Sequence, residues 1–224
     1  IRAGGLKLLL ALAVLLLAAD PAGARSYDVG EGRSLERLSQ VPWDDLLPGD
    51  VVRIYWRKTP YREKIVLRRS GTKTRPITIR GVRGPSMERP VLSGAGASHF
   101  QAMQSPLKAG RGLIILGDGK PASHVLIEGL EISSANSTER FTWGEATYNY
   151  RDNAAGVFVD KGTGITIRRC VIHGCSMGVI TGYAPDVGDF TLQSSWVYDN
   201  GDFDGSGWGH NVYLCANRTW VQFN

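Results

Sequence analysis

A short strand-like phrase recurs along this chain and limits the folds it can adopt more than any other feature does. It reads PITIRG, VLIEGLEI, ITIRRCVI and FTLQSSWV from Pro76, Val125, Ile165 and Phe190, and a last copy, WVQFN, begins at Trp220. Related units separated by roughly 25 to 40 residues indicate a repeat architecture. Because each copy is strand-like, the repeat predicts a solenoid in which every unit packs on its neighbours.

Alternation within each copy places two residues inward and one outward, as in Ile77-Thr78-Ile79. A second inward pair follows in Leu130/Ile132, Cys170/Ile172 and Ser195/Val197, and a third series comprises Leu113–Leu116, Gly156–Val159, Gly178–Ile180 and Asn211–Leu214. Three short strands per turn predict an all-β fold, namely a right-handed parallel β-helix with three-stranded rungs. A β-sandwich, the alternative, would show hairpin turns and evenly spaced strands.

The two ends of the chain are expected to differ from the repeat. Residues 1–24 combine basic residues, an apolar run and an Ala-Gly-Ala site, which predicts a signal peptide and a secreted or periplasmic protein without stable membrane insertion. An uncleaved anchor is the alternative. Residues 25–50 should form an N-terminal cap with a short amphipathic helix in Ser34–Leu47, and residues 51–224 the β-helix domain. Since nothing caps the last copy, we expect the natural protein to continue beyond Asn224.

Charge is unevenly distributed along the chain. Residues 51–90 hold twelve Lys and Arg against Glu63 and Glu88, whereas acidic residues outnumber basic ones from Asp118 onward. In an exported protein such a basic stretch indicates an anionic partner, such as an acidic polysaccharide, another cell-wall polyanion or a lipid headgroup. An ordinary solvated face is the alternative. Nucleic acid is not expected as a partner, because export separates the protein from it, and we expect a monomer.

Three cysteines, Cys170, Cys175 and Cys215, are too few for a scaffold built on disulfides. Cys170 falls at an inward position, which predicts a buried free thiol. The sequence leaves open whether Cys175 and Cys215 pair.

Two long corners flank a short one in the predicted solenoid. The short corner carries His173, and the long ones run over residues 133–155 and 198–210. This arrangement predicts a groove in which aromatic side chains stack on sugar rings, while acids, His and Arg act as acid–base groups. The candidates for sugar contact are Trp143, Tyr148, Trp208 and His210. Surface loops without chemistry are the alternative.

Oxygen-bearing side chains alternate over residues 200–205, Asn-Gly-Asp-Phe-Asp-Gly, as at the start of a calcium-binding loop. Asp202 and Asp204 are therefore candidate metal ligands, with calcium as the cofactor. A glycine- and aspartate-rich turn is the alternative, because Asn211 stands where an EF-hand has its distal glutamate.

One outward column should contain Arg80, Glu128, Arg168, Gln193 and Asn224. Glu128 and Arg168 are expected to be neighbours on adjacent turns. The column predicts a surface ion-pair ladder, or alternatively a cationic row that holds a carboxylate.

The chain resembles the pectin-lyase-like right-handed parallel β-helix superfamily over about residues 46–224. Its entry, LLPGDVVRIYWRKTPYREKIVLRRSGTKTRPITIRG, is similar to that of chondroitinase-B-like and alginate-lyase-like bacterial secreted proteins, and HNVYL at His210–Leu214 also recurs in such proteins. The Gly-His-Gly phrase of polygalacturonases is absent, since Asn211 follows His210. Members of this superfamily include polysaccharide lyases, hydrolases, epimerases and proteins of unknown role, so the resemblance specifies the fold better than the activity.

The resemblance implies a carbohydrate-active protein that acts on an acidic polysaccharide. If it is an enzyme, β-elimination or epimerisation at a uronate is the expected reaction, with His173 or Tyr150 as the base and Arg151 or Arg168 as the carboxylate partner. A non-catalytic glycan-binding or surface-structural solenoid is the alternative. A clustered set of His, Arg and Asp with perturbed pKa values would favour the enzyme.

Overall fold

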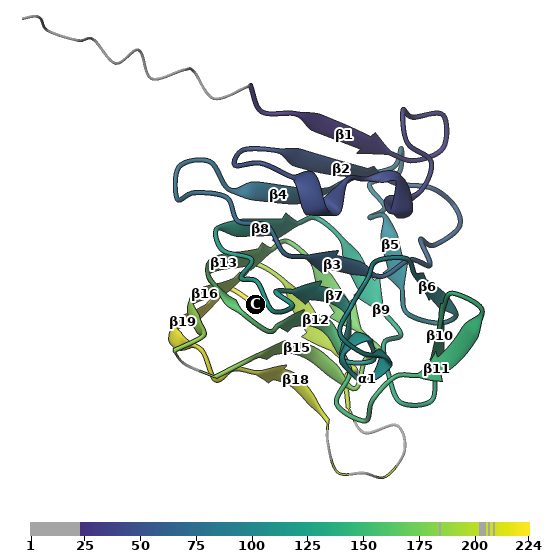
Figure 1. Cartoon of the computed structure of the whole chain (residues 1–224), viewed down its shortest axis with the longest axis vertical. Coiled ribbons are helices and arrows are strands. Elements are labelled where there is room, and N and C mark those ends of the chain that lie inside the picture. The colour runs from purple at the N-terminus through teal and green to yellow at the C-terminus, as the bar shows by residue number, and fades with distance from the viewer. Residues whose placement is uncertain (1–22, 184, 202–204, 206, 208) are drawn as a thin grey trace, which may run out of the picture.

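The computed structural model describes residues 23–183, 185–201, 205, 207 and 209–224. In this part of the chain, nearly all regular structure is β, and the chain passes through the same series of parallel sheets turn after turn (Figure 1). The turns stack along the longest axis of the molecule, from β1 at one end to β18 and β19 at the other. The all-β class and the parallel pairing of the repeat are therefore confirmed.

The longest sheet has seven strands, which are paired in the order β1 (Ser26–Val29), β2 (Val51–Tyr55), β4 (Ile77–Val82), β8 (Val125–Glu128), β13 (Gly162–Arg168), β16 (Val187–Gln193) and β19 (Asn217–Gln222). The recurring phrase lies in the last five of them, β4, β8, β13, β16 and β19. Ile79, Ile127, Ile167 and Leu192 stand in register across four turns and are buried. Each such side chain contributes about 1.5–3 kcal/mol on burial.

Two further parallel sheets complete each turn. The four-stranded sheet contains β5 (Val91–Ser93), β9 (Glu131–Ser133), β14 (Val171–His173) and β17 (Trp196–Tyr198). The five-stranded sheet contains β3 (Ile65–Leu67), β7 (Gly112–Leu116), β12 (Ala155–Val159), β15 (Met177–Thr181) and β18 (His210–Tyr213). The four-stranded sheet contains the second strand series that the sequence predicts, and the five-stranded sheet contains the third.

A two-residue bend joins the seven-stranded sheet to the four-stranded sheet. Gly129, Arg169 and Ser194 occupy the same place in three successive turns, and each has a positive φ, of 71°, 54° and 49°. The left-handed conformation reverses the in–out alternation of side chains. The second inward pair therefore begins one residue later than strict alternation from the first strand would place it. This backbone conformation is strained for a non-glycine residue such as Arg169 or Ser194. The pairing with neighbouring turns therefore imposes it against the preference of the residue itself.

The predicted helix in residues 34–47 is wrong. The segment forms two short 3-10 turns, Leu38–Gln40 and Trp43–Asp45, on either side of Pro42. Proline lacks an N–H donor and disfavours helix at the residue before it, so one continuous helix cannot form. The segment still covers the core of the first turns, because Leu38, Trp43 and Leu46 are buried.

The long corner after Ile132 carries a hairpin. Its strands, β10 (Arg140–Trp143) and β11 (Ala146–Asn149), are antiparallel, and β10 also pairs with β6 (Ala97–His99) from the preceding turn. The hairpin lies to one side of the stacked sheets, near the short helix α1 (Pro106–Ala109) (Figure 1).

All three cysteines are free, and Cys170 is buried as predicted. No helix among the described residues has the length and apolar character needed to cross a membrane.

Candidate functional site

A row of apolar side chains crosses the outer face of the five-stranded sheet. Val66, Ile115, Phe158, Ile180 and Tyr213 stand in register on five successive strands. Met103 packs against the first part of this row. At the other part, Phe158, Ile180 and Tyr213 line a pocket of about 490 Å³, which is within the usual range for small-ligand sites.

One end of this pocket carries a cation without an anionic partner. The guanidinium of Arg111 lies over the ring of Phe158, with Cζ 4.5 Å from the ring centroid. Its Nε is buried without a hydrogen bond, as is Oδ1 of the nearby Asn153, and no described carboxylate forms an ion pair with Arg111. Burial, and then the charge of Arg151, lower the pKa of Arg111. This end of the pocket therefore favours an anion.

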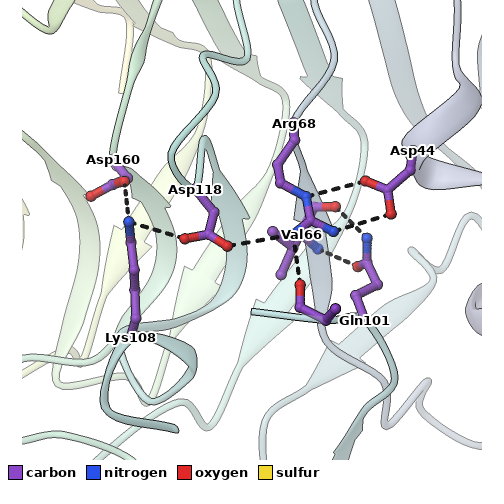
Figure 2. Close-up of polar contacts among 8 residues, drawn as sticks. Asp44, Val66, Arg68, Gln101, Lys108, Asp118 and Asp160 are labelled. Atoms are coloured by element: carbon purple, nitrogen blue, oxygen red, sulfur yellow. Dashed lines mark hydrogen bonds and ion pairs between the residues drawn. The ribbon is translucent and has the colours of Figure 1, made fainter. Parts of the chain in front are cut away.

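The acids at the other end already have cationic partners. Asp160 lies 3.0 Å from Nζ of Lys108, and Asp186 lies 3.0 Å from Nζ of Lys161. Asp160 is the last member of a row of alternating charges that continues through Lys108, Asp118, Arg68 and Asp44 (Figure 2). Burial opposes the charge of Lys108, but its bonds to Asp160 and Asp118 raise its pKa overall.

Three of these charged residues directly follow strands of the same sheet. Arg68 comes after β3, Asp118 follows β7 with one residue between, and Asp160 comes after β12. Equivalent strand ends stack on one another in parallel turns, so the charges form a line beside the pocket. The line holds three acids and two bases, and Asp160 also attracts Arg111 at longer range, but burial and the charge of Arg151 outweigh that attraction in the pKa of Arg111.

Two of the predicted site residues lie near this pocket. Arg151 is exposed, and its main-chain N–H donates to Gly110 beside Arg111. His210 stacks on Tyr213, with ring centroids 5.5 Å apart, and so lies at the rim. Trp208, Asp202 and Asp204 lie outside the described residues.

Tyr150 lies in the core rather than at a surface. It is 3% exposed, its hydroxyl donates to the carbonyl of Gly94, and burial raises its pKa well above the usual value. Nζ of the buried Lys64 lies 4.2 Å from the centroid of its ring and donates to the carbonyl of Gly112. A polymer bound at the surface would not reach this phenol.

Trp143 and Tyr148 belong to the β10–β11 hairpin and line a different hollow together with His99. The rings of Trp143 and His99 meet edge to face, with centroids 5.0 Å apart. Burial, and then the charges of Lys64 and Arg68, lower the pKa of His99 to about 4, despite opposing contributions from Gln101 and Asp118. The imidazole is therefore neutral at ordinary pH.

His173 and Arg168 face outward from two further sheets. On the four-stranded sheet, Nε2 of His173 lies 3.2 Å from Oε1 of Glu131, and its ring stacks on Tyr198. On the seven-stranded sheet, Nε of Arg168 donates to Glu128 over 2.7 Å, which confirms the predicted neighbours. The predicted site residues that the structure describes are thus distributed over several faces and do not share one groove.

Asn200, the first residue of the predicted calcium loop, has a structural role. Its Oδ1 accepts from the main chain of Cys175, and its Nδ2 donates to the carbonyls of Ile172 and Tyr198. These bonds fix the side chain of Asn200 between two neighbouring turns. Among the described residues, no group of three or more His, Cys, Asp or Glu could hold a metal ion.

The sequence analysis missed Arg111, Asp160 and Tyr213. A signal for them exists in the third strand series, where the outward positions Ile115, Phe158, Ile180 and Tyr213 are apolar or aromatic instead of polar. Such positions on a solenoid imply a cover or a ligand. Arg111 directly precedes β7, the strand that contains Ile115.

No family model matches the sequence, and a search of curated proteins found no match. Two solved structures are similar to this one. The GH136 lacto-N-biosidase from Eubacterium ramulus has 19% identity and a TM-score of 0.46, over 87% of this chain and 34% of that chain. The alginate lyase from Paenibacillus has 14% identity and a TM-score of 0.36, over 68% of this chain and 52% of that chain. This chain therefore spans about a third and about half of the two proteins, respectively.

Proposed function

We propose that this chain belongs to a carbohydrate-active protein of the right-handed β-helix class that binds an acidic polysaccharide on its five-stranded sheet. The observation that carries the proposal is the unpaired guanidinium of Arg111 at one end of a pocket floored by Phe158 and Tyr213. A uronate ring has an apolar face for such a floor and a carboxylate for such a cation. The pattern of residues 1–24 supports export as part of this proposal.

The pocket and its surroundings suit one uronate of a longer chain. Arg111 would form a forked pair with the carboxylate, and Arg151 would add attraction at longer range. Asn153, whose Oδ1 is unbonded, could accept a hydrogen bond from a sugar hydroxyl. Asp160 and Asp186 each form an ion pair with a lysine, Lys108 and Lys161, which weakens their repulsion of the ligand.

A second candidate function is chemistry at the same uronate, by β-elimination or epimerisation. The position of His210 at the rim favours it, since an imidazole beside the sugar could take the proton on the carbon that bears the carboxylate. Pairing of the carboxylate with Arg111 would stabilise the negative charge that develops there. A pure binder would have the same pocket without this proton transfer.

The experiment measures binding and turnover together. The protein is titrated calorimetrically with oligomers of alginate, pectate, chondroitin and heparin, with and without calcium, and each mixture is followed by ultraviolet absorbance for unsaturated uronate. We expect binding to at least one oligomer and its loss in Arg111→Met. Arg140→Met, which changes an exposed arginine outside the pocket, should bind like the wild type.

Absorbance that rises on one polymer would establish a lyase. A flat trace with Arg111-dependent binding would leave an epimerase or a binder, and proton exchange from the bound sugar into deuterated water would distinguish these two. Equal binding by Arg111→Met and the wild type would refute the proposed site.

A further inference from the structure

A second concave surface lies on the outer face of the seven-stranded sheet. Two hollows meet there at Arg168. One, of about 500 Å³, is lined among others by Thr166, Thr191 and Trp220. The other, of about 380 Å³, is lined by Arg80, Gly81, Arg83, Glu128, Gly129, Arg168 and Arg169.

The smaller hollow has a fixed cationic rim. Oε1 of Glu128 accepts from Nε of Arg80 over 2.5 Å, and Oε2 accepts from Nε of Arg168 over 2.7 Å. Burial alone would raise the pKa of Glu128, but the bonds from Arg168 and Arg80 outweigh it and lower that pKa. One ionised carboxylate on β8 therefore holds two guanidiniums, on the strands either side of it, and leaves their remaining N–H donors available.

The other arginines of this region make no ion pair with a described acid. Arg83 donates to the main-chain carbonyl of Met87, and the neighbouring Arg89 donates to that of Arg169. Burial, and then the charge of Arg83, lower the pKa of Arg89, so these two arginines repel each other. Four arginines and one glutamate line the hollow, so positive charge exceeds negative charge by three.

The floor of the hollow consists of main chain. A Cβ added to Gly81 would lie 2.3 Å from the carbonyl oxygen of Gly129, so no side chain can occupy this place. Gly129 itself has a φ of 71°, the left-handed conformation that glycine adopts without strain. Because these glycines on two adjacent turns have no side chains, the hollow reaches the main chain, and the arginine side chains form its rim.

We propose that this hollow binds a tetrahedral oxyanion, carried as a sulfate or phosphate ester on a sugar whose ring lies along Thr166 and Thr191 toward Trp220. Several guanidiniums that approach from different strands suit an oxyanion with three terminal oxygens, which a sulfate ester and a phosphate monoester both offer. Trp220 is 49% exposed and offers an aromatic face beside the hydroxyls of the two threonines. The site lies on a different sheet from Arg111, and the proposal does not depend on uronate binding there.

The test compares sugars that differ only in the ester. The protein is titrated with galactose 6-sulfate, galactose 6-phosphate and galactose, and binding is measured by calorimetry at low salt. We expect either ester to bind and galactose not to bind. The double variant Arg83→Gln/Arg169→Gln should weaken binding at least tenfold, whereas Arg140→Gln and Arg111→Met should not change it.

Circular dichroism and thermal unfolding would verify that each variant keeps the fold. A second variant, Arg169→Lys, retains the charge, and this variant should lose less affinity than Arg169→Gln. Repeating both titrations at a pH below and a pH above about 6 separates the two esters, because only the phosphate monoester gains a second charge in that range. Binding that survives in the double variant, or that disappears in Arg111→Met, would overturn the proposal.

Discussion

Arg111 and Phe158 stand on adjacent turns, and the guanidinium of the first covers the ring of the second at 4.5 Å from Cζ to the ring centroid. Phe158 lies on β12, and Arg111 directly precedes β7, which is paired with it. The stacking fixes the plane of the guanidinium without using its N–H donors. The cation is thus held in place and still able to bind a carboxylate.

We therefore predict that Arg111→Lys binds uronate oligomers about tenfold more weakly than the wild type, although the charge is kept. Lysine cannot form the forked pair and stacks less well on Phe158. Calorimetric titration measures the change, and Arg140→Lys is the matched control. Equal affinity in Arg111→Lys would mean that the site recognises charge alone.

A second prediction concerns Glu128. Replacement by Gln should lower the free energy of unfolding at pH 7 by about 1–3 kcal/mol, because two charge-assisted hydrogen bonds are weakened. The folded pKa of Glu128 is lowered, so its contribution is complete above the unfolded pKa and is lost as pH falls through the folded value. Urea unfolding from pH 7 to pH 3 should show the two proteins converging in acid, and a gap that does not depend on pH would contradict this.

A third prediction concerns Asp189 and Arg218. Arg218 donates to the two oxygens of Asp189 over 2.6 and 2.8 Å, and this pairing, helped by Thr163, lowers the pKa of Asp189 to about 2. In Arg218→Met the pKa should rise toward the usual value of about 3.9. An NMR titration of the Asp189 carboxyl carbon measures both values, and an unchanged pKa in the variant would disprove the assignment.

A fourth prediction concerns the buried Lys64. Burial lowers its pKa well below the usual value, so at any pH between the folded and unfolded pKa values the unfolded chain binds more protons at this site than the folded chain. Between the folded and unfolded pKa values, stability therefore rises with pH, by up to about 1.4 kcal/mol per pH unit. Lys64→Met lacks this contribution.

The measurement for Lys64 is the difference in unfolding free energy between the two proteins from pH 6.5 to pH 8. This window lies below the unfolded pKa values of cysteine and tyrosine, about 8.5 and 10, so Cys170, Cys175 and Tyr150 contribute little. The stability of the wild type should approach that of the variant, or exceed it, as pH rises. Parallel curves would show that Lys64 is charged in the folded protein.

The periodic part of the fold was predictable because one side chain in every two must face the core. The inward triplet at Ile165 and the bend at Arg169 repeat the same pattern as those of the neighbouring turns, and the structure pairs them as the sequence predicts. The outward column was predicted except at its end. Gln193 pairs with Gln222, while Asn224 lies beyond β19 and its Oδ1 accepts from the main chain of Ser195.

The site was less predictable, because no periodicity governs the corners. The hairpin that carries Trp143 turns back to pair with β6, a contact with a segment about 40 residues earlier that no local pattern encodes. The short corner predicts His173 as a site residue, yet His173 lies on the four-stranded sheet, whereas Arg111 directly precedes β7 of the five-stranded sheet. The side of the solenoid on which a corner residue lies depends on the angle between the sheets, and the sequence pattern does not predict that angle.

Gln101 closes the outer edge of the five-stranded sheet. Its Oε1 accepts from the N–H of Val66 and its Nε2 donates to the carbonyl of the same residue, on the side of β3 that faces away from β7. A primary amide has the same donor and acceptor as a peptide group, so one side chain takes the place that a neighbouring strand would fill. A strand from another molecule would have to displace this side chain before it could extend the sheet. Gln101 therefore protects the outer edge of β3 against strand addition and end-to-end aggregation.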